Sequence, residues 1–173
     1  MGWFRSKLSQ TMTTGAEIER IHLRVAGIGH DIQFSVAGPS STIGDVLARV
    51  AHETDVPAPY LMLLHRGKKL TYGDETLGDL KIKDRTRLLL LHAPEYGKDK
   101  KGIEALTAVT KELDDLENDT SIAPKVIDEM VTRACIKLDN IDVSGSGMLR
   151  DLRREALRRA HDLGEKRGNE GGG

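Results

Sequence analysis

The chain has 173 residues, 38% hydrophobic and 31% charged, a balance typical of a folded globular protein with one or two domains. Its 26 basic and 27 acidic side chains leave a net charge of -1, which excludes a general electrostatic attraction to nucleic acid or to an anionic membrane. Aromatic residues make up 3% of the chain, too few for a stacking platform that holds single-stranded nucleic acid.

Residues 1–18 show neither a helical nor a strand period, and we expect a disordered arm. The arm begins with Met1 and Gly2 and carries Ser6, the spacing of an N-myristoylation signal. Bulky Trp3 directly after Gly2 disfavours acylation, and a single myristoyl chain binds membranes only marginally. We favour an unstructured leader, with acylation of Gly2 as the alternative.

Apolar and polar residues alternate over residues 21–25 and again over 32–36. This period of two predicts a pair of half-buried strands. Gly27 and Gly29 supply a turn between them, so the pair is expected to form a hairpin. The two glycines do not form a phosphate-binding loop, because no Lys and Ser or Thr follow at the spacing that such a loop needs.

A helix is predicted after Thr42, because apolar residues recur at helical intervals over residues 43–50. Thr42 and Asp45 have the spacing of a capping box, in which each side chain accepts a bond from the other's amide. We expect the helix to end near residue 54, because Pro57 follows.

Two short strands are expected after this helix, over residues 61–64 and 87–91. Residues 66–69 are expected to form a turn into Leu70, and a loop is expected over residues 72–79. The order of elements is then ββαββ, a small sheet curled over one helix.

Residues 19–93 resemble the ubiquitin-like domains. The resemblance rests on Thr42-Ile43 at the start of the helix, the break at Pro57, Gly67 in the turn before Leu70, and the run from Asp74 through Leu77, Gly78 and Leu80 to Asp84. It implies a ubiquitin-like β-grasp domain of the α+β class.

Conjugation to other proteins is not expected of this domain. A transferable tag must end in Gly-Gly just after the last strand, whereas this chain continues through His92 and Pro94. Ubiquitin-like domains often bind partners through an apolar patch on the outer face of the sheet, and the resemblance places Leu64, Leu89 and Leu91 there. The alternative is that Leu64 and Leu91 pack against the linker or the helices that follow.

The rest of the chain is predicted to be mostly helical. Residues 94–102 are polar and unpatterned, which predicts a linker. Over residues 103–166 the apolar residues recur at helical spacing, and breaks at 118–124 and 143–147 predict an antiparallel three-helix bundle, an all-α domain. Residues 167–173 end in glycines and are expected to form a flexible tail. The predicted buried stripes are Ile103, Leu106, Thr110, Leu113 and Leu116; Val126, Ile127, Met130, Ala134, Leu138 and Ile141; and Leu149, Leu152, Ala156, Ala160 and Leu163.

The last two helices each have a second face that the predicted core does not use. Carboxylates flank an apolar residue on the second helix, and arginines surround a leucine on the third. Arginine makes directional pairs, and an apolar centre that loses water on contact is typical of a binding hot spot. The alternative is a solvated face with weak, screened ion pairs. The two sectors are Glu129, Thr132, Ile136 and Asp139, and Arg150, Arg153, Arg154, Leu157 and His161.

The second half also resembles the BAG domain, a three-helix co-chaperone module, over about residues 98–166. The resemblance rests on Glu129, on Leu-Asp-Asn-Ile at 138–141, on the glycine-bearing turn that follows, and on Arg-Asp-Leu-Arg-Arg at 150–154 with Leu157. A ubiquitin-like domain before a BAG domain is the order of the BAG-family chaperone regulators, plant members included. The resemblance therefore implies a co-chaperone that binds the nucleotide-binding domain of the 70-kDa heat-shock chaperone and promotes ADP release.

The resemblance also implies roles for single residues. In the family, carboxylates on the second helix and basic residues on the third bind the chaperone, and Glu129, Asp139 and Arg153 match these positions. Arg150 and Arg154 fall on further basic positions.

One position departs from the family pattern. His161 stands where the third helix usually carries Gln. It can still donate a hydrogen bond, and it can gain charge at about pH 6 to 7. We favour an ordinary exposed histidine over a pH switch.

Two other classes of function compete with this one. A pure adaptor would use the ubiquitin-like patch to bind the proteasome or other ubiquitin receptors while the bundle holds a client. An enzyme is disfavoured, because the six histidines lack metal-ligand spacing, Cys135 has no histidine nearby in sequence, and no nucleophile elbow is present. We expect no metal and no cofactor.

Cellular location is suggested by two further features of the sequence. A single cysteine cannot form an internal disulfide, and no apolar run approaches the roughly 20 residues of a membrane span. We therefore expect a cytoplasmic protein, with the nucleus as a second compartment, and neither nucleic acid nor stable membrane insertion among its partners.

Overall fold

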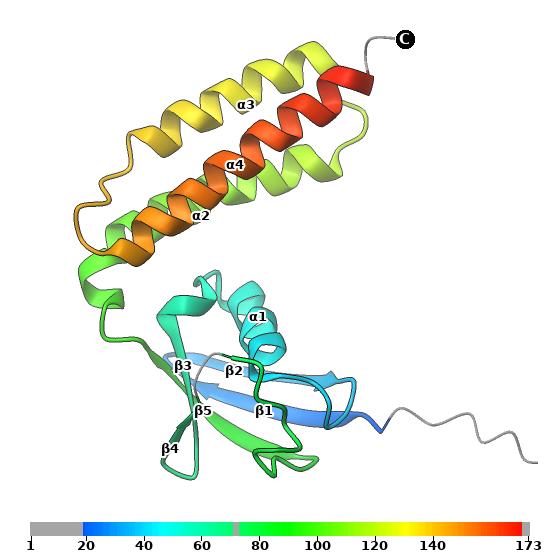
Figure 1. The fold of residues 1–173 in the computed structure, drawn as a ribbon, viewed down its shortest axis with the longest axis vertical. Helices are drawn as coiled ribbons and strands as arrows, with labels where there is room; N and C mark the ends of the chain where they lie inside the picture. The colour runs from blue at the N-terminus through cyan, green and yellow to red at the C-terminus, as the bar shows by residue number, and fades with distance from the viewer. Residues whose placement is uncertain (1–18, 71–72, 171–173) are drawn as a thin grey trace, which may run out of the picture.

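The computed structural model describes residues 19–70 and 73–170. The predicted arm, the acylation signal at Gly2 and the final glycines lie outside these ranges. The described chain forms a five-stranded sheet with one long helix, followed by three long helices (Figure 1). We refer to these two parts as the sheet domain and the bundle.

The sheet domain opens with the predicted hairpin of β1 (Ile21–Gly27) and β2 (His30–Val36), which pair antiparallel. β5 (Thr86–His92) runs parallel to β1 and antiparallel to β3 (Leu61–His65), and β4 (Lys68–Leu70) completes the edge beside β3. The strand order is β2-β1-β5-β3-β4. With one helix across the inner face, this is the β-grasp topology, and the predicted ubiquitin-like fold is confirmed.

Helix α1 (Ile43–Thr54) starts at the predicted capping box. The hydroxyl oxygen of Thr42 accepts from the Asp45 amide at 3.1 Å, and the Asp45 carboxylate accepts from the Thr42 amide at 2.9 Å. The apolar face of α1 packs in the core that also contains Leu88 and Leu90, both fully buried as their alternation in β5 predicts. A short 3-10 helix, η1 (Ala58–Tyr60), then leads into β3.

The sheet has one strand more than the sequence predicts. Only Arg66 and Gly67 form the turn after β3, and β4 begins at Lys68. Leu70 is the one buried residue of this short strand, so no alternation marks it in the sequence. The predicted order ββαββ is therefore wrong, and the observed order is ββαβββ.

The bundle consists of α2 (Tyr96–Asn118), α3 (Pro124–Asp139) and α4 (Gly147–Glu170), and the predicted antiparallel three-helix arrangement is confirmed. Leu113, Leu138 and Leu149 contribute fully buried side chains, one from each helix, to its core. In the part of the chain that the structure describes, no helix combines the length and the apolar character needed to cross a membrane.

The buried face of α3 differs from the predicted stripe. Val126 and Met130 are 47% and 39% exposed, whereas Val131, which the prediction omits, is buried. The predicted stripe mixes two adjacent sides of the helix. The residues that are buried recur at intervals of three and four, so they lie on one side of the helix. These residues are Ile127, Val131, Ala134 and Leu138.

Helix replaces the predicted linker. α2 begins at Tyr96, and Asp99 and Gly102 are buried within its first turns. Because one of these residues is polar and the other has no side chain, they leave no apolar period in the sequence. The tail predicted from residue 167 is also helical as far as Glu170. We propose that the boundary between the two domains lies just before Tyr96.

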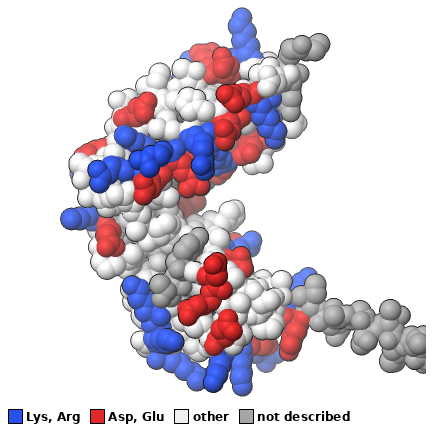
Figure 2. All heavy atoms as spheres, in the orientation of Figure 1, with Lys and Arg blue, Asp and Glu red and all other residues white. Residues whose placement is uncertain are grey.

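The two domains lie on either side of α1. Figure 1 shows α1 between the sheet and the bundle, so the outer face of the sheet points away from the bundle. The end of α1 faces α2 and α4 across a cleft of about 600 Å³, seen as the notch in Figure 2. Asp55 bridges this cleft, because its carbonyl accepts from the Thr107 hydroxyl at 3.3 Å and its carboxylate pairs with Lys111 at 3.4 Å.

Candidate functional site

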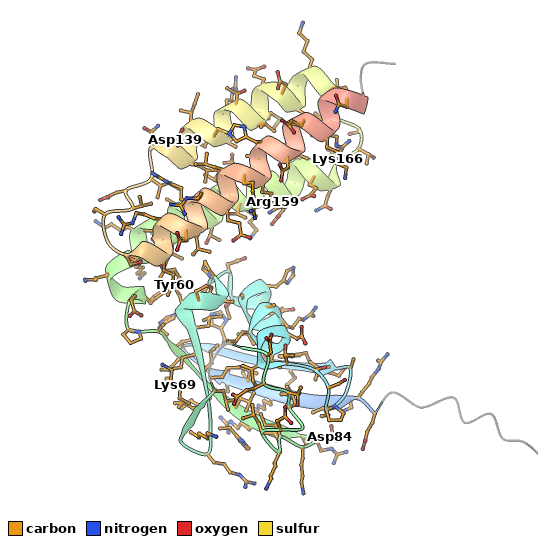
Figure 3. All side chains as sticks on the ribbon, viewed as in Figure 1. Tyr60, Lys69, Asp84, Asp139, Arg159 and Lys166 are labelled. Atoms are coloured by element: carbon orange, nitrogen blue, oxygen red, sulfur yellow. The ribbon has the colours of Figure 1, made fainter. Side chains whose placement is uncertain are left out.

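Helix α2 is joined to the other two helices by ion pairs. Lys137 of α3 donates to both carboxylate oxygens of Glu112 at 2.7 Å. Arg159 of α4, labelled in Figure 3, pairs with Asp114 at 2.5 Å and with Glu117 at 2.6 Å. The Arg159 guanidinium lowers the pKa of the Glu117 carboxyl below its usual value. Three carboxylates of α2 are therefore already paired with basic side chains of the same protein.

The register between α3 and α4 follows from two contacts. The Arg153 guanidinium donates to the carbonyl of Ile141 at 3.4 Å, which places the start of α4 beside the end of α3. Further along, a Cβ built on Gly164 would lie 3.4 Å from a methyl group of Val131. Asp139, at the end of α3 (Figure 3), is thus next to the first turns of α4.

The predicted site residues of α3 all lie on its exposed side. Lys137 marks the flank that faces α2. At 100° per residue, Thr132 and Asp139 lie on the opposite flank, toward α4, and Glu129 and Ile136 point directly away from the core. All four are exposed, and Ile136 is the most exposed large apolar side chain of the bundle at 57%.

The predicted site residues of α4 lie on its side toward α3. Arg150, Arg154 and His161 are exposed. Arg153 and Leu157 lie closest to α3 by helical spacing and are half-buried. Leu157 packs against the core, so the prediction that it points outward is wrong. One N–H group of Arg153 already donates to a backbone carbonyl of the protein itself.

We call this surface the α3/α4 face. Its own ion pairs join Glu129 to Arg133 at 2.6 Å and Arg154 to Asp151 at 3.2 Å. Both pairs are exposed and lie within one helix, so they contribute little to stability. Within residues 19–70 and 73–170, Asp139 and Arg150 form no ion pair. The face consists of Glu129, Thr132, Ile136, Asp139, Arg150, Arg153, Arg154, Leu157 and His161.

The α3/α4 face is therefore acidic along α3 and basic along α4, with apolar side chains between the two. Figure 2 shows the basic side chains that run along α4. The sheet domain lies on the other side of the bundle, next to α2 and one edge of α4. Among the described residues, the sheet domain therefore leaves the face open to a partner.

The predicted patch on the sheet is also present at the surface. Leu64 and Leu89 are direct partners on β3 and β5, and Leu89 is 49% exposed. Leu64 and Leu91 are half-buried. Arg66 and Arg87 line a shallow hollow together with Leu64 and Leu89. This surface is an apolar strip with a basic rim.

The sequence did not reveal a third cluster, where the two domains meet. Asp99, in the first turn of α2, is 2% exposed. Its Oδ2 accepts from the hydroxyl of Tyr60 at 2.6 Å and from the hydroxyl of Ser146. The Ser146 oxygen also accepts from the Leu149 amide at 3.2 Å, as in a helix cap. We call Tyr60, Asp99 and Ser146 the junction.

Aromatic rings lie around the junction. Tyr96 is edge-on to Tyr60, with 6.4 Å between ring centroids, and its other neighbour, His92, stacks on it at 3.7 Å. Burial and the Asp99 carboxylate raise the pKa of Tyr60 to about 12. Burial lowers the pKa of His92 below its usual value. In the sequence, this cluster is indicated only by Ser146, which precedes an apolar helical run and so has the position of a helix cap.

Comparison with protein families decides what the helices are. A family model described as the BAG domain matches residues 94–166. Residues 94–166 are a BAG domain. The match takes in α2, α3 and most of α4, and it includes the segment that the sequence had suggested to be a linker.

Two examples illustrate the solved structures to which the chain is similar. One is Arabidopsis ATBAG1 in complex with HSP70, with 18% identity over 87% of this chain and 97% of that chain and a TM-score of 0.40. The other is the ubiquitin of Caldiarchaeum subterraneum, with 23% identity over 43% of this chain and 94% of that chain and a TM-score of 0.40. A comparison with curated proteins finds no match. The assignment of the BAG domain rests on the family model.

Proposed function

We propose that this protein is a co-chaperone whose BAG domain binds the nucleotide-binding domain of a 70-kDa heat-shock chaperone and promotes ADP release. The match to the BAG domain supports the class of partner. The observation that carries the proposal is the α3/α4 face, which presents carboxylates and guanidinium groups side by side on a surface that the sheet domain leaves open.

The proposed contacts use groups that the protein itself leaves available. Asp139 and Arg150 are exposed and form no ion pair in the described part of the chain. Guanidinium groups form bidentate bonds with carboxylates, which fix the orientation of a partner. Ile136 and Leu157 provide apolar area between the charges that loses water on contact. We propose all residues of the α3/α4 face as chaperone-binding residues.

The proposed mechanism is allosteric and makes no covalent bond. The BAG domain binds the chaperone with its nucleotide cleft open more tightly than with the cleft closed on ADP, and ADP then leaves sooner. A ligand shifts such an equilibrium only by its difference in affinity for the two forms. A coupling of about 1 to 3 kcal/mol corresponds to roughly 5- to 150-fold.

No catalytic group is needed for this mechanism, and the BAG domain is a non-catalytic module. Burial raises the pKa of the Cys135 thiol, and the nearby Asp139 carboxylate acts in the same direction. The thiol is half-buried and packs against the core. It therefore stays protonated and contributes to packing. We propose that the protein acts in the cytoplasm, with the nucleus as a second compartment.

Release of fluorescent ADP from a purified 70-kDa chaperone tests the proposal. The full chain should accelerate release, and Arg150→Glu should remove most of the acceleration. Lys166→Glu is the matched control, because Lys166 is also an exposed basic residue of α4 (Figure 3) but lies on the side toward α2. No acceleration by the full chain, or equal acceleration by Arg150→Glu, would exclude the proposal.

A second function is favoured by the apolar strip on the sheet. Leu64 and Leu89 adjoin on the outer face, which points away from the bundle, so the two surfaces can hold two partners at once. We propose that this strip, with Leu91, binds the proteasome or ubiquitin receptors, making the protein an adaptor. Leu64→Asp with Leu89→Asp should abolish capture of a purified ubiquitin receptor and leave chaperone binding unchanged, and Arg150→Glu should do the reverse.

A further inference from the structure

We propose that Asp99 is a positioning residue that couples the sheet domain to the first turn of α4, so that a change at Tyr60 alters the part of the BAG domain that carries Arg150 and Arg153. The coupling itself is a property of the free protein. Only its consequence for the chaperone rests on the proposed function.

One carboxylate oxygen connects three separate segments of the chain. Asp99 belongs to α2, Tyr60 ends η1 of the sheet domain, and Ser146 directly precedes α4. Both hydroxyl groups donate to the same Oδ2 atom. The hydroxyls of Tyr60 and Ser146 are themselves 3.4 Å apart. A change in the position of either donor must therefore change the surroundings of the other.

The junction has little room for an alternative arrangement. The Oδ1 atom of Asp99 is buried and accepts no hydrogen bond from the described residues. A Cβ built on Gly145 would lie within van der Waals overlap of this Oδ1, and one built on Gly102 would overlap Leu149. A buried carboxylate is costly unless it keeps its donors. Asp99 thus depends on both hydroxyls and cannot swing aside.

The junction continues into the α3/α4 face through α4. The Ser146 hydroxyl accepts from the Leu149 amide, and the Ser146 carbonyl accepts from the Arg150 amide at 3.4 Å. Arg153 lies one turn further and bonds the carbonyl of Ile141. Ser146 thus fixes the first turn of α4, and this turn determines the positions of Arg150 and Arg153 on the α3/α4 face.

A second polar contact between the domains, also formed by described residues, is weaker. Asp55 contacts Thr107 and Lys111 across the cleft, and the side chains of Asp55 and Lys111 are 62% and 66% exposed. Exposed pairs of this kind resist motion little. The buried junction is therefore the contact through which displacement of the sheet domain reaches the BAG domain.

The first test places a substitution in one domain and measures the other. In the full-length chain, Tyr60→Phe removes one donor to Asp99 and keeps the ring. Hydrogen exchange of the Leu149 and Arg150 amides should become faster by about tenfold, the factor expected for one lost hydrogen bond to a charged group. The Ala160 amide in the middle of α4 should keep its protection. Unchanged exchange at Leu149 and Arg150 would overturn the coupling.

Tyr96→Phe is the matched control for this substitution. It removes the same hydroxyl from a neighbouring ring, and among the described residues that hydroxyl makes no hydrogen bond with Asp99. It should leave the exchange of the Leu149 amide as in the natural protein. If both variants accelerate exchange equally, the effect is general loosening of the aromatic cluster and the coupling is refuted.

The second test starts from the other side of the junction. Gly145→Ala introduces a methyl group against Oδ1 of Asp99. The pKa of Tyr60, raised to about 12, should then fall toward its ordinary value, measured by NMR from the ring carbon signals of Tyr60 in the Gly145→Ala variant as the pH is raised. Gly97→Ala is the control, because a Cβ on Gly97 meets nothing within 4 Å. An unchanged Tyr60 titration in Gly145→Ala would contradict the proposal even if Tyr60→Phe failed to fold.

Both readouts are made on the free protein, so they can fail independently of chaperone binding. Where the exchange and titration results are as expected, ADP release by Tyr60→Phe shows whether the coupling reaches the chaperone. Normal ADP release together with altered exchange would overturn the functional part of the proposal, namely that Asp99 positions the α3/α4 face.

Discussion

The junction and the α3/α4 face use similar polar groups in opposite ways. At the junction, Asp99 is buried and its donors belong to the same chain. On the α3/α4 face, Asp139 and Arg150 are exposed, and in the described ranges neither forms an ion pair. The difference teaches that buried polar groups here determine the shape of the molecule, whereas the exposed charges are available to a partner.

The largest expected effect on stability comes from Asp99→Ala. The substitution leaves the hydroxyls of buried Tyr60 and half-buried Ser146 without their acceptor, which should cost about 3 kcal/mol in the free energy of unfolding. Chemical denaturation of the full chain measures this loss. A loss no larger than that of an exposed substitution such as Asp139→Ala would remove the distinction between the two clusters.

A charge reversal on the α3/α4 face should affect binding more than folding. Arg153→Glu should weaken binding to the chaperone by about 2 kcal/mol, roughly thirtyfold. The reason is that the new carboxylate would repel the chaperone carboxylate that Arg153 is proposed to pair with, in a contact that excludes water. Calorimetric titration with the chaperone's nucleotide-binding domain measures the change. Denaturation of the same variant is the check, since Arg153 also bonds the Ile141 carbonyl. A loss of stability as large as the loss of binding would mean that Arg153 is structural.

A smaller effect is expected at the capping box of α1, whose residues belong to neither cluster. Thr42→Ala removes the acceptor for the Asp45 amide and should destabilise the protein by about 1 kcal/mol. Thermal unfolding followed by circular dichroism measures it. Chaperone affinity should stay unchanged, and a parallel loss of affinity would show that α1 takes part in the contact.

The smallest effect at neutral pH is the titration of Tyr60. Its pKa is raised by burial and Asp99 to about 12, above the value of about 10 expected in the unfolded chain. The protonated phenol therefore contributes stability below pH 10, and this contribution is lost as the pH rises from about 10 to about 12. Denaturation of the natural protein and of Tyr60→Phe over this range should show a steeper decline for the natural protein. Parallel declines would contradict the buried contact with Asp99.

Regular patterns in the sequence were enough to predict most of the fold. Alternation located β1 and β2, and Thr42 with Asp45 located the start of α1, because these elements depend on local spacing. β4 was missed because one buried leucine in three residues makes no pattern. The start of α2 was missed because Asp99 is polar and is buried only by contacts with residues distant in sequence.

The candidate site was predictable to a similar degree. Helical spacing correctly grouped the exposed residues of α3 and α4, since a helix fixes which side chains share a side. The same spacing did not reveal that Leu157 and Arg153 are half-buried, because that depends on how closely α3 approaches α4. The junction was not predictable, because its residues come from three segments that only the folded chain brings together.

The most direct measurement of the central claim is the affinity of the full chain for the chaperone's nucleotide-binding domain, determined by calorimetry with and without ADP. If the α3/α4 face prefers the open nucleotide cleft, ADP should weaken binding by roughly 5- to 150-fold, because coupling between two ligands is reciprocal. Equal affinity in the two conditions would contradict a role in nucleotide exchange.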